Sequence, residues 1–205
     1  MTRVYFVRHA QPEHDWEEDR TRPLTEEGKK DSAIVLEFLK DKKIDAFYCS
    51  PYKRSMDTIA EAADFFTKEI ITDERLRERE KGLDGNNHGM FRKRWADHNY
   101  HEEGGESIAM VQKRNIEALN EILSDNTDKD IVIGTHGTAL STILNFYDSN
   151  FGCEDFLRII DWMPYIIELD FESSCNEMKS ECPIYSFKFI AKQEYCYIEK
   201  QFKGK

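Results

Sequence analysis

Three short apolar segments of the sequence each end on residues that can handle a phosphate group. These residues are Arg8-His9 after the first segment, Ser50-Pro51 with Arg54 after the second, and Thr135-His136-Gly137 after the third. A neutral imidazole is a good nucleophile toward phosphorus, and the arginine guanidinium presents a planar fork of donors that matches phosphate oxygens. Two histidines and two arginines in these positions therefore point to phosphoryl-transfer chemistry.

Transfer of a phosphoryl group mainly requires positioning and neutralisation of the charge on its equatorial oxygens. Arg8, Arg54 and a protonated or donating His136 can do what Mg²⁺ does in other enzymes, so we expect neither a metal nor a cofactor. The predicted substrate-binding residues are Arg8, Gln11, Arg22, Arg54, His136 and Gly137.

The reaction also needs an acid that protonates the leaving oxygen and a base that activates water afterwards. Three carboxylates, Glu74, Glu78 and Glu80, lie in one charged segment. A carboxylate near a phosphate has a raised pKa and can hold a proton near neutral pH. Composition alone does not choose among the three.

The apolar segments that must position these residues are 3–7, 44–49 and 130–134. They are short, rich in β-branched or aromatic residues and almost continuously apolar, which is typical of strands covered on both faces. In open α/β sheets, ligands bind beyond the carboxyl ends of the strands. If the three strands are parallel, their terminal histidines and arginines converge at one place.

Helical patterns lie between these segments. One helix is predicted to begin with Thr25 as its N-cap, with Ala33, Leu36 and Leu39 facing inward, and a second runs from about Glu106 to Leu123. Strands that alternate with helices predict an α/β fold with a mainly parallel sheet.

The last forty residues have a different pattern. Residues 165–171 and 185–190 are predicted to be two strands joined by a polar loop, and we expect them to form an antiparallel hairpin at the edge of the sheet. No internal repeat and no Gly/Pro/Ser-rich linker divides the chain. The expectation is therefore a single domain over residues 1–205.

Composition restricts the setting in which this chain works. A net charge of -11 argues against nucleic acid and anionic membranes as partners, and no apolar run is long enough to span a bilayer. The amino terminus has no signal-peptide pattern, so we expect a cytoplasmic protein. Five cysteines without a C-x-x-C pair argue against a disulfide framework or a zinc site. The sequence leaves the oligomeric state open, including a homodimer.

Taken together, these motifs resemble the histidine phosphatase superfamily, also called phosphoglycerate mutase-like. The matching segments are Arg8-His9-Ala10 for R-H-G, Ser50 to Thr58 for S-P-x-x-R-x-x-x-T, Leu76-Arg77-Glu78 for L-x-E, Gly105-Glu106-Ser107 for G-E-S and His136-Gly137 for the final H-G. The resemblance implies a three-layer α/β/α fold without a metal. It also implies that His9 is the nucleophile, that Arg8, Arg54 and His136 form the phosphate pocket, and that Glu78 is the proton donor.

Within that family the sequence favours a phosphatase over a 2,3-bisphosphoglycerate-dependent mutase. The mutase branch typically continues its first signature with Ser or Thr and then Asn, whereas this chain has Gln11-Pro12-Glu13-His14-Asp15. An aspartate there would repel a second phosphate. The predicted function is hydrolysis of a small phosphorylated metabolite through a phosphohistidine. The alternatives are the mutase and, from another class, a non-catalytic phosphate-binding regulatory module.

The remaining histidines and the first loop have simpler interpretations. His14, His98 and His101 lack metal-like spacing and are expected to be exposed, whereas His88 lies in a loop that could reach the substrate. Residues 13–19 are strongly acidic and most simply form a solvated loop. Because this loop follows the nucleophile, it is also a candidate lid, and Arg20 or Arg22 could then contact the substrate.

Overall fold

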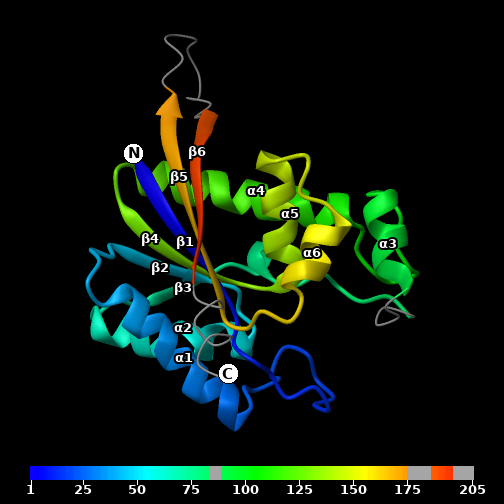
Figure 1. Cartoon of the computed structure of the whole chain (residues 1–205), viewed down its shortest axis with the longest axis horizontal. Coiled ribbons are helices and arrows are strands. Elements are labelled where there is room, and N and C mark those ends of the chain that lie inside the picture. The colour runs from blue at the N-terminus through cyan, green and yellow to red at the C-terminus, as the bar shows by residue number, and fades with distance from the viewer. Residues whose placement is uncertain (84–88, 175–185, 196–205) are drawn as a thin grey trace, which may run out of the picture.

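A computed structural model describes residues 1–83, 89–174 and 186–195 of the chain, with a six-stranded sheet at its centre (Figure 1). The strands are β1 (Thr2–Arg8), β2 (Ala46–Cys49), β3 (Ile70–Thr72), β4 (Asp130–Thr135), β5 (Tyr165–Ser174) and β6 (Ser186–Tyr195). Their order in the sheet is β3-β2-β4-β1-β5-β6. The first four in that order are parallel, β5 is antiparallel to β1, and β6 is antiparallel to β5. The predicted parallel sheet with an antiparallel hairpin at its edge is confirmed.

Helices cover both faces of this sheet. They are α1 (Glu26–Leu39), α2 (Lys53–Phe65), α3 (Gly89–Ala96), α4 (Ile108–Asp125), α5 (Gly137–Tyr147) and α6 (Cys153–Ile159), with a 3₁₀ turn, η1, at Glu74–Leu76. In Figure 1, α1 and α2 lie together on one side of the sheet, whereas α4, α5 and α6 lie on the other. The predicted three-layer α/β/α fold is therefore confirmed.

The central strands belong to two hydrophobic clusters at once. In β1, Val4 and Phe6 pack in the cluster that includes α4, α5 and α6, whereas Tyr5 and Val7 pack in the cluster that includes α1 and α2. Successive strand residues point to opposite faces of a sheet. A strand buried on both faces must be apolar throughout, which is why the sequence of β1 shows no alternation.

The two predicted helices form, with small differences at their ends. The Oγ1 of Thr25 accepts the N–H of Gly28 at 2.9 Å and caps α1, but Ala33 is exposed and Val35 is buried in its place. The second helix begins two residues later than predicted, because Ser107 is its N-cap and accepts the N–H of Met110.

Some features expected from composition lie only partly within the described chain. Cys49 and Cys153 are free thiols, and the other three cysteines lie outside the described residues. None of the helices placed by the structure is long and apolar enough to cross a membrane. Within the same part of the chain, no group of three or more His, Cys, Asp or Glu side chains is arranged to hold a metal ion.

Candidate active site

The carboxyl ends of β1, β4 and β2 lie side by side. In the strand register, Val7 is paired with Gly134, and Gly134 is paired with Cys49. The alignment continues past the strands, because the N–H of His9 donates to the carbonyl of Thr135 at 3.1 Å. The residues that follow the three strands therefore meet at one edge of the sheet, as predicted.

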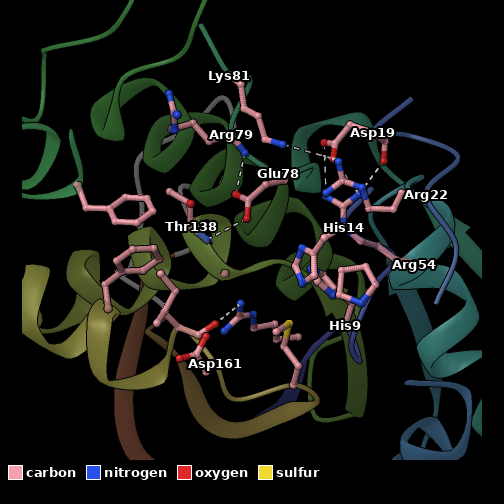
Figure 2. A pocket seen from close by; sticks show the side chains of 17 residues that line it. His9, His14, Asp19, Arg22, Arg54, Glu78, Arg79, Lys81, Thr138 and Asp161 are labelled. Atoms are coloured by element: carbon pink, nitrogen blue, oxygen red, sulfur yellow. Dashed lines mark hydrogen bonds and ion pairs between the residues drawn. The ribbon is translucent and has the colours of Figure 1, made fainter. Parts of the chain in front are cut away.

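A cavity of about 440 Å³ opens at this edge (Figure 2). The predicted site residues that line it are Arg8, His9, Arg22, Arg54, Glu78 and Gly137. Apolar side chains, among them Phe91 and Phe156, form part of its wall. The cavity thus combines cations, two histidines (His9 and His14) and carboxylates with apolar side chains.

His9 is buried, and among the described residues a hydrogen-bond partner is found for Nδ1 but not for Nε2. Its Nδ1 lies 2.8 Å from the carbonyl oxygen of Ala10, which can only accept a hydrogen bond, so Nδ1 carries the proton. Burial, and then the charges of Arg54 and Arg8, hold the pKa of His9 well below its ordinary value. The imidazole is therefore neutral at physiological pH, with the lone pair of Nε2 free to attack.

Arg8 lines the cavity and is held in place by the carboxyl end of α6. Its guanidinium donates to the carbonyl oxygens of Ile159 at 2.6 Å and Ile160 at 2.7 Å. A Cβ on Gly137 would lie 3.2 Å from the guanidinium carbon, so glycine is the residue that fits beside Arg8. Burial lowers the pKa of Arg8 to about 10, which leaves it charged at neutral pH. Its buried Nε has no hydrogen-bond partner within the described chain.

Arg54 lies in the first turn of α2 and is almost fully buried. Its Nη1 donates to the backbone carbonyl of Asp19 at 2.6 Å, and the Asp19 carboxylate lies 3.4 Å from the same nitrogen. Burial lowers the pKa of Arg54, although Asp19 and Glu78 partly offset this effect. A side chain of the first loop thus contacts the predicted phosphate-binding arginine.

His136 lies next to His9 and is not itself among the residues that line the cavity. The two imidazole ring centroids are 5.3 Å apart, and the Nε2 of His136 is 2.7 Å from the hydroxyl oxygen of Ser50. Its Nδ1 is buried without a hydrogen-bond partner in the described part of the chain. Burial, followed by the charge of Arg54, holds the pKa of His136 well below its ordinary value. His136 is therefore a neutral donor, not the protonated one that we considered.

The carboxylate of Glu78 is docked on the amino terminus of α5 (Figure 2). Its Oε2 accepts the N–H of Thr138 at 3.0 Å, and its Oε1 accepts the N–H groups of Ala139 at 3.2 Å and Arg79 at 2.7 Å. Of the three carboxylates in the charged segment, Glu78 alone lines the cavity. Glu74 pairs with Arg20 on the surface.

Arg114 of α4 holds the loop that carries Glu78. It donates to the carbonyl oxygens of Arg75 at 2.6 Å, Arg77 at 2.8 Å and Glu78 at 3.0 Å. Glu106 pairs with Arg114 at 2.8 Å and also accepts the N–H of Glu80. The Gly105-Glu106-Ser107 motif thus has a structural role at this site, which the sequence pattern alone did not reveal.

Not every predicted residue reaches the cavity. Gln11 is exposed and its side chain accepts a hydrogen bond from Thr25, because the backbone at Gln11 is tied to the start of α1. Asp15 is also exposed and outside the cavity lining, and the aspartate of this loop that lines the cavity is Asp19. Arg20 points to Glu74, and of the two arginines in this loop it is Arg22 that lines the cavity.

The other histidines divide in a similar way. His14 is exposed as expected, but it also lines the cavity. His101 is exposed, whereas His98 is half-buried against Trp95. His88 lies outside the described residues. Asp19, Lys81, Thr138 and Asp161 line the cavity although the sequence pattern did not single them out.

Comparison with known proteins places these features in a family. The model of the histidine phosphatase superfamily (branch 1) matches residues 4–161. Phosphoserine phosphatase 1 of Hydrogenobacter thermophilus is 29% identical over 154 residues, which cover 66% of this chain and 71% of that protein. A 2,3-bisphosphoglycerate-dependent phosphoglycerate mutase of Thermoplasma acidophilum is 44% identical over 55 residues, or 27% of this chain and 28% of that protein.

The fold has solved counterparts as well. A phosphoserine phosphatase of Entamoeba histolytica in complex with 3-phosphoglyceric acid superimposes with a TM-score of 0.70 at 22% identity, over 92% of this chain and 97% of that one. At this identity the likeness concerns the fold.

The two buried histidines predict a specific loss of stability in mild acid. In the unfolded chain a histidine binds its proton below a pKa of about 6.5, whereas His9 and His136 stay neutral in the folded protein to much lower pH. The free energy of unfolding should therefore be retained above pH ~6.5 and fall as pH decreases below it, by up to about 1.4 kcal/mol per pH unit for each histidine. Urea unfolding between pH 7.5 and 5.5 measures this slope.

The slope should be smaller in His9→Asn and in His136→Asn, and unchanged in the control His101→Asn, which alters an exposed histidine. Comparing slopes removes the constant effect of each substitution on stability. Equal slopes in all four proteins would contradict the assignment of the two neutral imidazoles.

A second prediction concerns Arg114. Arg114→Met removes the donor of three carbonyl oxygens and one of the two arginines that pair with the Glu106 carboxylate, so the free energy of unfolding should fall by about 2 to 4 kcal/mol. Lys113→Met removes the same charge from the exposed neighbouring position of α4 and should change the free energy of unfolding by less than about 0.5 kcal/mol. Similar losses in both variants would mean that Arg114 does not hold this loop.

Proposed function

Because this chain belongs to the histidine phosphatase superfamily, we propose that it hydrolyses a small phosphomonoester and that His9 carries the phosphoryl group between the two steps. The observation on which the proposal depends is the state of His9. Its imidazole is neutral, its Nδ1 donates to Ala10, and its free Nε2 belongs to a ring on the cavity wall beside Arg8 and Arg54.

In the first step, Nε2 of His9 attacks phosphorus in line with the ester bond. The P–N bond forms as the P–O bond to the leaving alcohol breaks, and that oxygen takes a proton from Glu78. Arg8, Arg54 and His136 donate to the nonbridging oxygens, and two of the donors available for this are the unpaired Nε of Arg8 and Nδ1 of His136. The carbonyl of Ala10 stabilises the positive charge that develops on the imidazole.

In the second step, Glu78 is a carboxylate and takes a proton from water. The oxygen of this water attacks phosphorus as the P–N bond breaks. Inorganic phosphate then leaves, and His9 is neutral again. Glu78 accepts three N–H groups in the free protein, and these hold its carboxyl oxygens at the amino terminus of α5 on the cavity wall.

Small phosphorylated metabolites fit this cavity better than large ones, because its volume is about 440 Å³. The similarity to phosphoserine phosphatase 1, and to the fold of a phosphoserine phosphatase bound to 3-phosphoglyceric acid, makes phosphoserine and 3-phosphoglycerate the first substrates to try.

The mutase is a second candidate, favoured by the local 44% identity to a phosphoglycerate mutase. A mutase must accommodate a second phosphate, and the carboxylate of Asp161 on the cavity wall opposes this. Incubation with 3-phosphoglycerate and a bisphosphoglycerate primer separates the candidates: we expect inorganic phosphate and no 2-phosphoglycerate. Formation of 2-phosphoglycerate faster than phosphate would favour the mutase.

The phosphohistidine predicts covalent labelling of the protein. A ³²P-labelled phosphomonoester should label the wild type in an acid-labile, base-stable form, with or without a chelator, whereas His9→Ala should take up no label. His101→Ala, an exposed histidine, is the control and should label normally. Persistent labelling of His9→Ala would exclude His9 as the nucleophile, and strict Mg²⁺ dependence would count against the whole scheme.

The role of Glu78 can be tested by the leaving group. Glu78→Gln should lower the hydrolysis rate of an alkyl phosphate by about 100-fold or more, because an alkoxide needs its proton. The first step with an aryl phosphate should be less affected, since a nitrophenolate leaves without one, and phosphoenzyme should accumulate because the base is missing. Equal losses in the first step for both esters would contradict the role as acid.

A further inference from the structure

We infer that the cavity contains a second anion subsite, formed by Arg22 and Lys81, which binds a carboxylate on the alcohol part of the substrate. In the free protein, the side chain of Asp19 fills this subsite (Figure 2). The inference rests on the proposed hydrolysis and narrows its substrates to phosphomonoesters that carry a carboxylate.

The first observation is the environment of the Asp19 carboxylate. Its Oδ1 lies 3.2 Å from a guanidinium nitrogen of Arg22, 3.4 Å from Nη1 of Arg54 and 3.7 Å from Nζ of Lys81. All four side chains line the same cavity. A carboxylate shared by three cations marks the place where these cations can bind a carboxylate from another molecule.

The second observation is a spare donor on Arg22. The side chain of Arg22 is only 14% exposed, and its Nε is buried without a hydrogen-bond partner among the residues that the structure describes. Its Nη2 contacts Asp19 and, at 3.4 Å, the carbonyl of Trp16. A buried N–H without a partner costs free energy. A ligand carboxylate with two oxygens can engage this donor as well as Nη2.

The third observation places the subsite on the side of the leaving alcohol. Lys81 lies three residues after Glu78 on the same segment, and both line the cavity. Glu78 must reach the leaving oxygen, so Lys81 is placed to reach groups of the alcohol beyond that oxygen. The phosphate itself is assigned to Arg8 and Arg54, and the subsite lies next to it, because one oxygen of Asp19 contacts both Arg54 and Arg22.

The loop that carries Asp19 allows the exchange without a backbone rearrangement. Its two ends are joined by a bridge between Pro12 and Leu24, and the N–H of Lys53 donates to the carbonyl of Arg20. The carbonyl of Asp19 is fixed by Arg54 in the same way. Only the Asp19 side chain has to turn away, and a phosphate dianion at Arg54 would repel it in that direction. Arg22 and Lys81 then have no counter-ion until the substrate carboxylate arrives.

Matched pairs of esters test the subsite. Glycerol 3-phosphate differs from 3-phosphoglycerate by having an alcohol in place of the carboxylate, and phosphoethanolamine is phosphoserine without its carboxylate. In the His9→Ala protein, which binds without turnover, each carboxylate-bearing ester should bind about 10- to 100-fold more tightly than its partner in calorimetric titration, the effect of one or two charge-assisted hydrogen bonds. Equal affinities within both pairs would overturn the inference.

Substitutions then assign the preference to its residues. Arg22→Met and Lys81→Met, each added to His9→Ala, should reduce the preference within both pairs to less than about 3-fold, because the remaining cation is solvated. Asp19→Asn should tighten binding of 3-phosphoglycerate, whereas Asp15→Asn, which removes the same charge from an exposed position in the loop, should not. If Asp19→Asn instead weakens phosphoserine alone, Asp19 is a ligand for the ammonium group and not an occupant of the subsite.

Failure of this inference can be told apart from failure of the proposed function. If the wild type hydrolyses an aryl phosphate but both ester pairs show equal affinities, the phosphatase activity is supported and the carboxylate subsite is contradicted. If titration shows a carboxylate preference but no ester is hydrolysed, the subsite is supported and the phosphatase activity is contradicted.

Discussion

The parallel pairing of β1, β4 and β2 is the constraint on which the rest of the site depends. Each strand is buried on both faces, so its neighbours and its register are fixed by the two hydrophobic clusters around it. That register leaves His9, Ser50 and His136 at one edge of the sheet. A shift of one residue in β1 would exchange its two buried faces and move His9 away from His136. The chemistry therefore follows from core packing.

Because Arg8 and Arg54 are buried, their charges act strongly both on His9 and on a phosphate in the cavity. Arg8 and Arg54 are mostly removed from water, and their charges help to keep the neighbouring His9 neutral. The same charges are available to the nonbridging oxygens of a phosphate. In a chain of net charge -11, this local concentration of cations is what makes an anionic substrate acceptable. Solvent exposure of these arginines would weaken both effects together, because water screens their charges.

Much of the fold could be predicted from the sequence, because continuous apolar runs and helix caps are local signals. The N-cap role of Thr25 could be predicted from the residues that directly follow it. The convergence of the strand ends followed from the rule that ligands bind beyond the carboxyl ends of parallel strands. Side-chain positions that depend on contacts between distant parts of the chain could not be predicted from such local signals. Gln11 follows His9 closely in sequence, yet the pairing of its backbone with Thr25 turns it out of the cavity. Asp19 faces the cavity only because the loop closes between Pro12 and Leu24.

In the free protein, two carboxylates pair with the N–H groups and cations of the cavity. Glu78 rests on the N–H groups of α5, and Asp19 rests on Arg54, Arg22 and Lys81. Both carboxylates are negative, so they repel an anionic ligand that enters the cavity. They also prevent buried cations and N–H donors from remaining unpaired, a state that costs more free energy than exchanging one partner for another. In the proposed mechanism, substrate binding is therefore an exchange of anions, in which a phosphomonoester takes the place of the Asp19 carboxylate at these cations.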